Sequence, residues 1–244
     1  MEIAAILEPV GQSRGVTQIF AHRGLHQHVP ENTVAAFAEA VAVGADGIEL
    51  DVRRCADGAL VVHHNPTVAD GRLIREVACR DLPDHLPTLA VALAACGDLI
   101  VNVEIKNDPS EPDFDPSGSL VTDVAGIIDE GGHRDRVIIS SFHYGTCLQV
   151  VEMSSPLPVG WLLDVGADVA SCVRQAAAAG FAAVHPFFMD VTSESVALAH
   201  GLGVAVNTWT VNREEDIRHL LDLGVDGVIS DDPVLARNCH RRPH

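Results

Sequence analysis

The sequence has few aromatic residues, and this shortage limits the kind of core it can form. Aromatic residues make up 4% of the 244 residues, although hydrophobic residues make up 47%. A core of this composition must consist mainly of Ala, Val, Leu and Ile. These residues suit parallel β-strands that helices cover on the outside, because such strands are buried and read as continuous aliphatic runs.

Basic residues are also scarce. Lys and Arg together number 16, against 34 Asp and Glu, and the formal net charge is −18. A chain this acidic repels polyanions, so nucleic acids and anionic membrane surfaces are excluded as general partners. We expect a small-molecule partner instead, and an anionic substrate would need a cation at its binding site.

Three further features are missing: a secretory signal, a membrane span and a paired-cysteine motif. Glu2 and Glu8 stand where a signal peptide would have a basic start and an unbroken apolar run. No segment approaches the length of a transmembrane helix. The six cysteines form no C-x-x-C pair, which argues against a zinc site or a disulfide framework. We therefore predict a cytoplasmic protein without stable membrane association, and the sequence leaves its oligomeric state open.

Short aliphatic runs alternate with longer Ala- and Leu-rich segments along most of the chain. The expected strands are Val16–Ala21, Gly47–Val52, Leu60–His64, Leu99–Ile105, Arg136–Ser141, Pro158–Leu163, Phe181–His185, Val204–Thr210 and Gly227–Ser230. The expected helices are Thr33–Val43, Ser119–Glu130, Thr146–Met153, Ala167–Ala179, Ser193–His200 and Arg213–Leu223. Candidate N-caps for three of these helices are Asn32 or Thr33, Ser193, and Asn212.

This repeated alternation predicts a parallel sheet with right-handed crossovers. About eight such units in a chain of this length favour a single-domain (β/α)8 TIM barrel with its active site at the carboxyl ends of the strands. An open doubly wound sheet is the alternative. No G-x-G-x-x-G motif follows the first strand, which argues against it.

The predicted barrel domain covers residues 16–238, after an N-terminal extension of residues 1–15 and before a tail of residues 239–244. Turn-forming residues concentrate at 65–86 and 108–118. We expect the second stretch to be an exposed loop over one end of the barrel, and we expect the tail to be frayed.

Acidic residues gather at the ends of two expected strands. Side chains alternate between the faces of a strand, so Glu49 and Asp51 share one face, as do Glu104 and Lys106. If the aliphatic residues between them face the helices, three carboxylates meet in the mouth of the barrel. A divalent cation such as Mg²⁺ or Ca²⁺ would relieve their mutual repulsion. The alternative is a salt-bridge network around Lys106, but E-x-D followed by E-x-K favours the metal site.

Two histidines end strands beside the acidic residues. His22 and His64 could act as base and acid on a bound substrate, because imidazole titrates near neutral pH. His63 competes with His64 for this position, since alternation allows only one of the two to face inwards. The strand pattern alone leaves that choice open.

The motifs H-R-G, P-E-N-T, E-L-D-V, V-V-x-H, V-E-I-K, W-T-V-N and D-G-V-I-S-D-x-P occur in this order between about Phe20 and Pro233. Together they resemble the glycerophosphodiester phosphodiesterase family. The resemblance implies a (β/α)8 barrel that hydrolyses glycerophosphodiesters to glycerol 3-phosphate and an alcohol with one divalent cation, Mg²⁺ or Ca²⁺. It also implies that the glycerol hydroxyl of the substrate can attack first and form a cyclic phosphate, which water then opens.

The resemblance assigns a role to each matching residue. His22 becomes the proton acceptor and His64 the proton donor, which selects His64 over His63. The implied metal ligands are Glu49, Asp51 and Glu104. The implied substrate contacts are Arg23 and Lys106 to the phosphate and Trp209 as an apolar wall beside the glycerol. Pro30 to Thr33 is expected to be scaffold, with a supporting role for Glu31 or Asn32 left as an alternative.

The sequence departs from the family pattern at two places. Asn65 follows the second histidine where the family usually has an aspartate, and the insertion after it is short, which predicts a more open site. Two related functions stay open: a phospholipase D or sphingomyelinase D type of enzyme that releases a cyclic phosphate, and a catalytically impaired anion-binding barrel. A generic phosphate-handling barrel enzyme would not explain two histidines beside three carboxylates.

Overall fold

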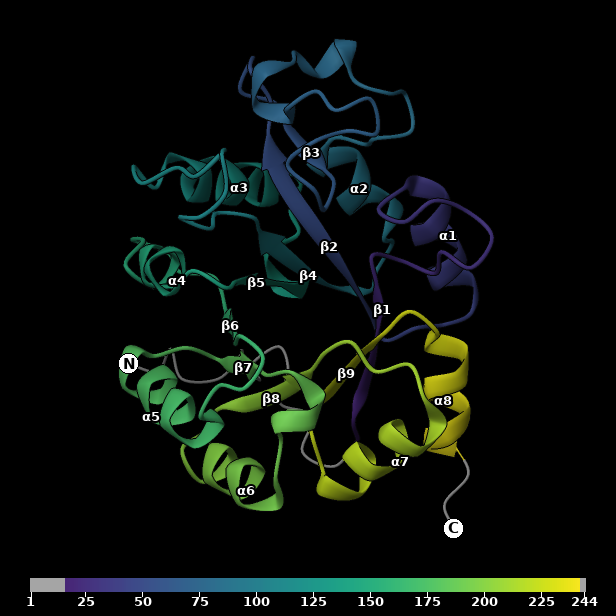
Figure 1. Ribbon diagram of the computed structural model, residues 1–244, viewed down its shortest axis with the longest axis vertical. Coiled ribbons are helices and arrows are strands. Elements are labelled where there is room, and N and C mark those ends of the chain that lie inside the picture. Colours follow the sequence, from purple (N-terminus) through teal and green to yellow (C-terminus); the bar gives the residue numbers. More distant parts are fainter. Residues whose placement is uncertain (1–15, 242–244) are drawn as a thin grey trace, which may run out of the picture.

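A closed barrel of parallel strands forms the centre of the computed structural model, which describes residues 16–241 (Figure 1). Its strands are β1 (Gln18–His22), β2 (Gly47–Arg54), β4 (Ile100–Ile105), β5 (Val137–Ser141), β6 (Val159–Leu162), β7 (Ala183–His185), β8 (Ala205–Thr208) and β9 (Gly227–Ser230). The sheet order is β1-β9-β8-β7-β6-β5-β4-β2, and pairing of β1 with β2 closes the barrel. The predicted (β/α)8 architecture is confirmed.

Helices cover the outside of the barrel. They are α1 (Val34–Ala42), α2 (Leu89–Ala95), α3 (Ser119–Glu130), α4 (Tyr144–Val151), α5 (Val169–Ala179), α6 (Ser193–Gly201), α7 (Glu214–Leu223) and α8 (Pro233–Arg241). Over residues 16–241, no helix is both long enough and apolar enough to cross a membrane.

Helices α2 and α8 were not predicted. Helix α2 has only seven residues, too few for a clear helical period, and it follows a turn-rich stretch. Helix α8 opens on Pro233, where proline is well suited to a first helical position. The expectation of a frayed tail is wrong as far as Arg241, because α8 includes these residues and Cys239 is buried. The predicted extension 1–15 lies outside the described residues.

The helix caps differ in part from the prediction. Thr33 caps α1, since its hydroxyl accepts a hydrogen bond from the backbone N–H of Ala36. Thr192, rather than Ser193, caps α6. Asn212 does not cap α7, and its side chain instead bonds Asp231, the residue after β9.

Strand alternation divides the core into two parts. Ile48, Leu50 and Val52 of β2 are buried in the main aliphatic cluster between strands and helices. Residues on the other face point into the barrel, where Ile138, Ala183 and Ala205 form a separate small cluster. The polar site residues of β2 are therefore inward-facing members of a strand whose other face, as far as Val52, is aliphatic.

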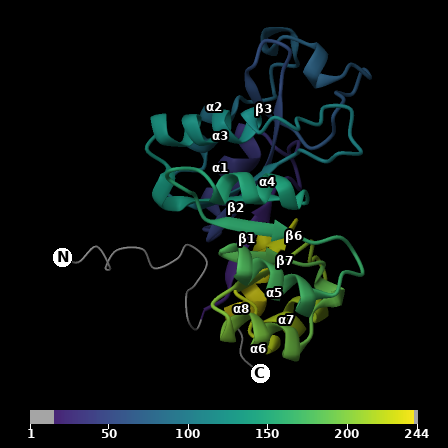
Figure 2. The ribbon, with the colours of Figure 1, turned by 90° about the vertical axis from the view of Figure 1, so that its left-hand side faces the viewer.

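Residues 55–86 form a small projection after β2. It contains β3 (Leu60–Val62), which pairs antiparallel with β2 and lies outside the barrel, and two short 3₁₀ helices, η1 (Ile74–Glu76) and η2 (Cys79–Asp81). Its own small core is made of Cys55, Val61, Val68, Ile74 and Leu82. In both views this projection lies at the end of the molecule opposite α6 (Figures 1 and 2). It stands beside the carboxyl end of β2, next to the barrel mouth.

Candidate active site

Three buried carboxylates meet at the carboxyl ends of β2 and β4. Glu49, Asp51 and Glu104 each place an oxygen within 4.8 Å of the others, and all three residues are buried. The register explains the cluster, because Asp51 pairs with Glu104 across the two parallel strands. The sequence pattern predicted this grouping from side-chain alternation.

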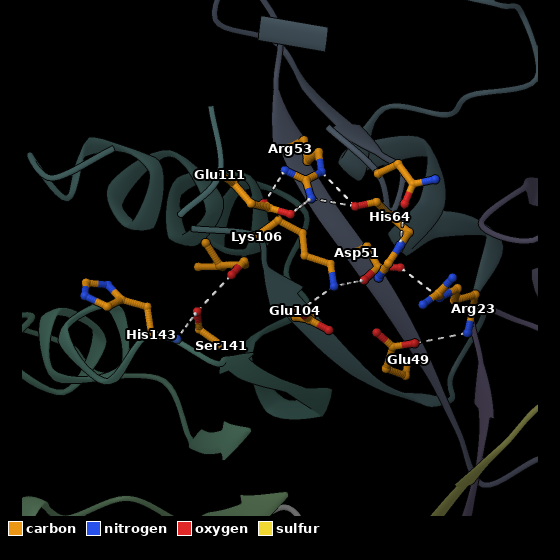
Figure 3. A network of polar contacts seen from close by, with 12 residues as sticks. Arg23, Glu49, Asp51, Arg53, His64, Glu104, Lys106, Glu111, Ser141 and His143 are labelled. Carbon is orange, nitrogen blue, oxygen red and sulfur yellow. Dashed lines mark hydrogen bonds and ion pairs between the residues drawn. The ribbon is translucent and has the colours of Figure 1, made fainter. Parts of the chain in front are cut away.

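Two cations lie against the carboxylates (Figure 3). The ammonium of Lys106 is 2.9 Å from Asp51 and 2.6 Å from Glu104. The guanidinium of Arg23 is 3.3 Å from Asp51, and the backbone N–H of Arg23 donates to Glu49 at 3.1 Å. The salt-bridge network that the sequence offered as the alternative to a metal site is therefore present. It leaves Glu49 as the carboxylate with the least compensation.

The pKa of Asp51 is shifted in the opposite direction from the pKa values of the two glutamates. Burial, together with the charges of Asp51 and Glu104, raises the pKa of Glu49 well above its ordinary value. Burial also raises the pKa of Glu104, against the effect of Lys106. The pKa of Asp51 is lowered instead, because Lys106 and Arg23 outweigh the effect of burial. At the two glutamates burial thus outweighs the stabilisation that nearby cations give to the ionised form.

The donor set suits a hard divalent cation. Glu49 Oε1 is buried and has no hydrogen-bond partner, so a carboxylate oxygen is available at the centre of the cluster. Carboxylate oxygens are the preferred protein ligands of Mg²⁺ and Ca²⁺. The residues present therefore fit a metal site with Glu49, Asp51 and Glu104 as ligands.

His22 lies at the end of β1 with its ring held in one orientation. Its Nδ1 is 2.6 Å from Oδ1 of Asp231, and its Nε2 is 3.9 Å from Oε2 of Glu49. An N–H at Nδ1 that donates to the carboxylate leaves the lone pair of Nε2 directed toward the acidic cluster. This is the tautomer that a general base at this position requires.

Asp231 contacts two further polar side chains besides His22. It contacts Nε2 of His26 at 3.2 Å and accepts a hydrogen bond from the side-chain amide of Asn212. Burial opposes its ionisation, but the hydrogen bonds from His22, His26 and Asn212 hold its pKa below the ordinary range. The lowered pKa favours the ionised form of Asp231, which holds the ring of His22 by a hydrogen bond.

The structure separates the two adjacent histidines that follow β3. His63 turns away, and its Nε2 lies 3.2 Å from the carbonyl oxygen of Thr67. His64 lines a pocket together with Glu104 and Lys106. Its Nδ1 is 2.9 Å from Oδ1 of Asn65, the residue that replaces the usual aspartate, so an amide oxygen now orients the ring.

The P-E-N-T stretch supports the site directly. Asn32 is buried, and its side-chain amide donates to Asp51 at 2.7 Å. Glu31 accepts from the guanidinium of Arg23 at 2.8 Å. Arg23 and Asn32 both adopt positive φ angles, +54° and +57°, and a backbone bond joins them from Asn32 N–H to Arg23 carbonyl. Thus only Thr33 serves helix α1, while Glu31 and Asn32 position site residues.

Trp209 follows β8 in an aromatic group at the barrel mouth. Its ring packs edge-on against Phe142 and Phe187, with centroids 5.5 and 5.7 Å away. Its indole N–H donates to the carbonyl oxygen of His185 at 2.7 Å. The ring is thereby fixed at the pocket beside Phe142, and its contact with glycerol stays a prediction.

Sequence reasoning missed four polar residues of this region. They are His26, Arg53, Asn212 and Asp231. Arg53 could have been found, because alternation along β2 places it on the face of Glu49 and Asp51. Asp231 gave a weaker signal as a polar residue at a strand end. His26 and Asn212 lie in loops, where no local period reports the direction of a side chain.

The turn-rich stretch 108–118 is also more firmly attached than predicted. Asp113 is mostly buried against Arg53, and the side chain of Asn107 bonds to the backbone of Asp115 in both directions. The expectation of a simple exposed loop is therefore wrong for its central part. Polar contacts that come from other strands hold the loop, and a turn-forming composition does not report them.

A model of the glycerophosphoryl diester phosphodiesterase family matches residues 22–235. A glycerophosphodiester phosphodiesterase of Caldanaerobacter subterraneus is 33% identical over 93% of this chain and 98% of its own length. The crystal structure of a Silicibacter pomeroyi protein assigned as a glycerophosphoryl diester phosphodiesterase superposes with a TM-score of 0.82 and 30% identity. That match covers 92% of this chain and 93% of the other.

A second solved structure carries a bound molecule. It is a phosphodiesterase of Oleispira antarctica in complex with the product sn-glycerol 3-phosphate, with a TM-score of 0.81 and 21% identity, over 92% of this chain and 96% of the other. At this identity the similarity shows the fold alone. The family model and the Caldanaerobacter relative show more: this chain belongs to the glycerophosphoryl diester phosphodiesterase family and is an enzyme of the phosphoric diester hydrolase class.

Proposed function

We propose that this protein hydrolyses glycerophosphodiesters to glycerol 3-phosphate and an alcohol, with one divalent cation, Mg²⁺ or Ca²⁺, held by Glu49, Asp51 and Glu104. The observation that carries the proposal is the arrangement of His22. Its Nδ1 is tied to Asp231, and its Nε2 faces the carboxylate cluster. Family membership and the product bound to the Oleispira phosphodiesterase support the choice of substrate.

His22 and His64 divide the proton transfers between them. Nε2 of His22 accepts the proton of the attacking hydroxyl while a new P–O bond forms. His64 donates a proton to the alcohol oxygen as its bond to phosphorus breaks. The attacking hydroxyl is that of the glycerol, which would yield a cyclic phosphate for water to open, or that of water directly.

Positive groups balance the charge that attack adds to the phosphate oxygens. Arg23 and Lys106 lie against the carboxylate cluster. Each has further N–H groups that can donate hydrogen bonds to the phosphate. When bound, the divalent cation supplies further compensation and polarises the phosphoryl oxygens. This local positive charge would allow an anionic substrate to bind to a chain whose net charge is strongly negative.

The pocket beside His64 is the natural place for the leaving alcohol. Its lining includes Lys106, Asp108, Glu111, Phe142, His143 and Asp164 in addition to His64 and Glu104. Trp209 packs against Phe142 at its edge and would face the glycerol. We infer that the two ends of the substrate extend to either side of the carboxylate cluster.

The experiment combines activity with metal binding. Protein freed of metal with a chelator should release glycerol 3-phosphate from glycerophosphoethanolamine only after Mg²⁺ or Ca²⁺ is restored. His22→Ala should lower kcat by about 10²–10⁴-fold, the usual contribution of a general base. Glu49→Gln should weaken Ca²⁺ binding in calorimetry, which reports on the site independently of turnover.

His28→Ala is the matched control, because His28 is an exposed histidine of the same loop. It should keep full activity. Undiminished turnover in His22→Ala would refute the base assignment. A cyclic phosphate as the final product, seen by phosphorus NMR, would instead favour the phospholipase D type of reaction, and tight phosphate binding without turnover would favour an impaired barrel.

A further inference from the structure

Arg53 is the largest side chain that the described residues bury completely, with 1% of its surface exposed. It follows Asp51 by two positions on β2 and therefore lies on the same face. Burial of a guanidinium is costly unless charge and hydrogen bonds compensate it. The contacts of Arg53 show where that compensation comes from.

Every nitrogen of the Arg53 guanidinium has a partner (Figure 3). Nε and Nη2 donate to the backbone carbonyl oxygen of His64 at 2.8 and 2.6 Å. Nη1 and Nη2 donate to the two carboxylate oxygens of Glu111 at 2.8 and 3.0 Å. Nη1 also donates to Asp113 at 2.7 Å. One planar group thus joins β2, the second residue after β3 and the loop that follows β4.

The backbone at His64 has no regular secondary structure to hold it. Strand β3 ends at Val62. One more backbone hydrogen bond to β2 follows, from the N–H of His63 to the carbonyl oxygen of Asp51. Beyond it, the Arg53 fork holds the His64 carbonyl with two bonds. The side chain of Asn65 contacts only the ring. Arg53 therefore supplies the two hydrogen bonds that hold the carbonyl group of His64.

We propose that Arg53 is a positioning residue that sets the place of His64 for proton donation to the leaving alcohol, and that Glu111 completes this support from the loop after β4. The inference rests on the proposed role of His64. A displacement of about 1 Å in a catalytic group can cost about 10²-fold in rate, so the loss of one guanidinium contact should be measurable.

Substrates with different leaving groups can distinguish the positioning role of Arg53 from a purely structural role. An alkoxide needs a proton as it departs, whereas p-nitrophenolate leaves readily without one. A displaced His64 should therefore slow the hydrolysis of glycerophosphoethanolamine but hardly that of glycerol phosphate p-nitrophenyl diester. A general loss of folding or of metal binding would slow both reactions alike.

We would compare both substrates in wild type, His64→Ala, Arg53→Lys and Glu111→Gln. His64→Ala should lose about 10²-fold or more on the ethanolamine ester and much less on the nitrophenyl ester. Arg53→Lys should show the same selectivity with a loss of about 10-fold or more on the ethanolamine ester. Glu111→Gln keeps Arg53 in place, should fold normally and should show a smaller loss in the same direction.

Arg54→Lys is the matched control, because Arg54 neighbours Arg53 but bonds Ser119 and Asp123 on the outer side. It should leave the ratio of the two rates unchanged. Selectivity in His64→Ala without selectivity in Arg53→Lys and Glu111→Gln would overturn the inference alone. If His64→Ala itself shows no selectivity, both the inference and the assignment of His64 as the acid are overturned.

Discussion

Asn65 stands where the resemblance to the family leads us to expect an aspartate. Its amide oxygen accepts from Nδ1 of His64 at 2.9 Å. Burial, with a further contribution from Lys106, lowers the pKa of His64. An aspartate at this position would stabilise the imidazolium, which the neutral amide does much less. The proposed proton donor, His64, therefore loses its proton more easily than it would beside an aspartate.

Asn65→Asp should raise the pKa of His64 and shift the alkaline limb of the kcat/KM profile to higher pH. The sign follows from the role of His64, because a general acid must be protonated and a higher pKa keeps it protonated further into alkaline pH. The pH profile on glycerophosphoethanolamine measures the shift, and the imidazole NMR signals of His64 report its pKa directly. Asn212→Asp is not an equivalent change, because Asn212 bonds Asp231, the partner of His22, and not His64.

An alkaline limb that stays in place, or moves to lower pH, would contradict this prediction. His28→Ala serves again as the control, since an exposed loop histidine should leave the profile as it is.

Strands β6 and β7 show how elements of the barrel fit together beneath the site. Gly160 of β6 faces His185 of β7, and a Cβ on Gly160 would lie 2.2 Å from Nε2 of that histidine. His185 is buried, and its Nε2 accepts from the side-chain amide of Asn207 on β8 at 3.0 Å. The absence of a side chain on one strand thus makes room for an imidazole on the next.

Gly160→Ala should lower the free energy of unfolding by about 1–3 kcal/mol, because the added methyl group overpacks a closed interior. Denaturant unfolding measures the change. Gly126→Ala is the matched control, since Gly126 lies in helix α3 and a Cβ there meets no atom within 4 Å. That variant should gain about 0.5–1 kcal/mol from improved helix propensity. A Gly160→Ala protein as stable as wild type would show that His185 can move aside.

Acid sensitivity is a property of the whole molecule to which His185 contributes. Burial lowers the pKa of this histidine from 6.5 to about 3. Between these two values the unfolded chain binds a proton that the native protein does not bind. Stability therefore falls as the pH decreases below about 6.5, by at most about 1.4 kcal/mol for each unit.

His185→Asn removes this titration while all carboxylates stay in place. Between pH 7 and pH 5, wild type should lose about 2 kcal/mol more of its free energy of unfolding than the variant loses. Urea unfolding of both proteins at the two pH values provides the comparison. Equal losses would mean that His185 is protonated in the native protein at pH 5.

Features that depend on neighbouring residues could be predicted from the sequence, whereas features that depend on distant residues could not. Alternation along β2 and β4 placed Glu49, Asp51, Glu104 and Lys106 in the mouth of the barrel, because the direction of a side chain in a strand is set by its nearest neighbours. Helix α2 was missed since seven residues carry too little period. The prediction of Asn212 as a helix cap is wrong, because its partner Asp231 is distant in the sequence.

Periodicity and motif order by themselves determined the (β/α)8 architecture and the carboxylates at its mouth. Only the tertiary structure decided the partners of those residues. His22 and Asp231 are 209 residues apart and meet because closure of the sheet brings β9 beside β1. The contacts of Arg53 with Glu111 and Asp113 likewise join distant segments. The physical reason is that backbone alternation sets a side chain's direction locally, whereas its partner depends on how the whole chain closes.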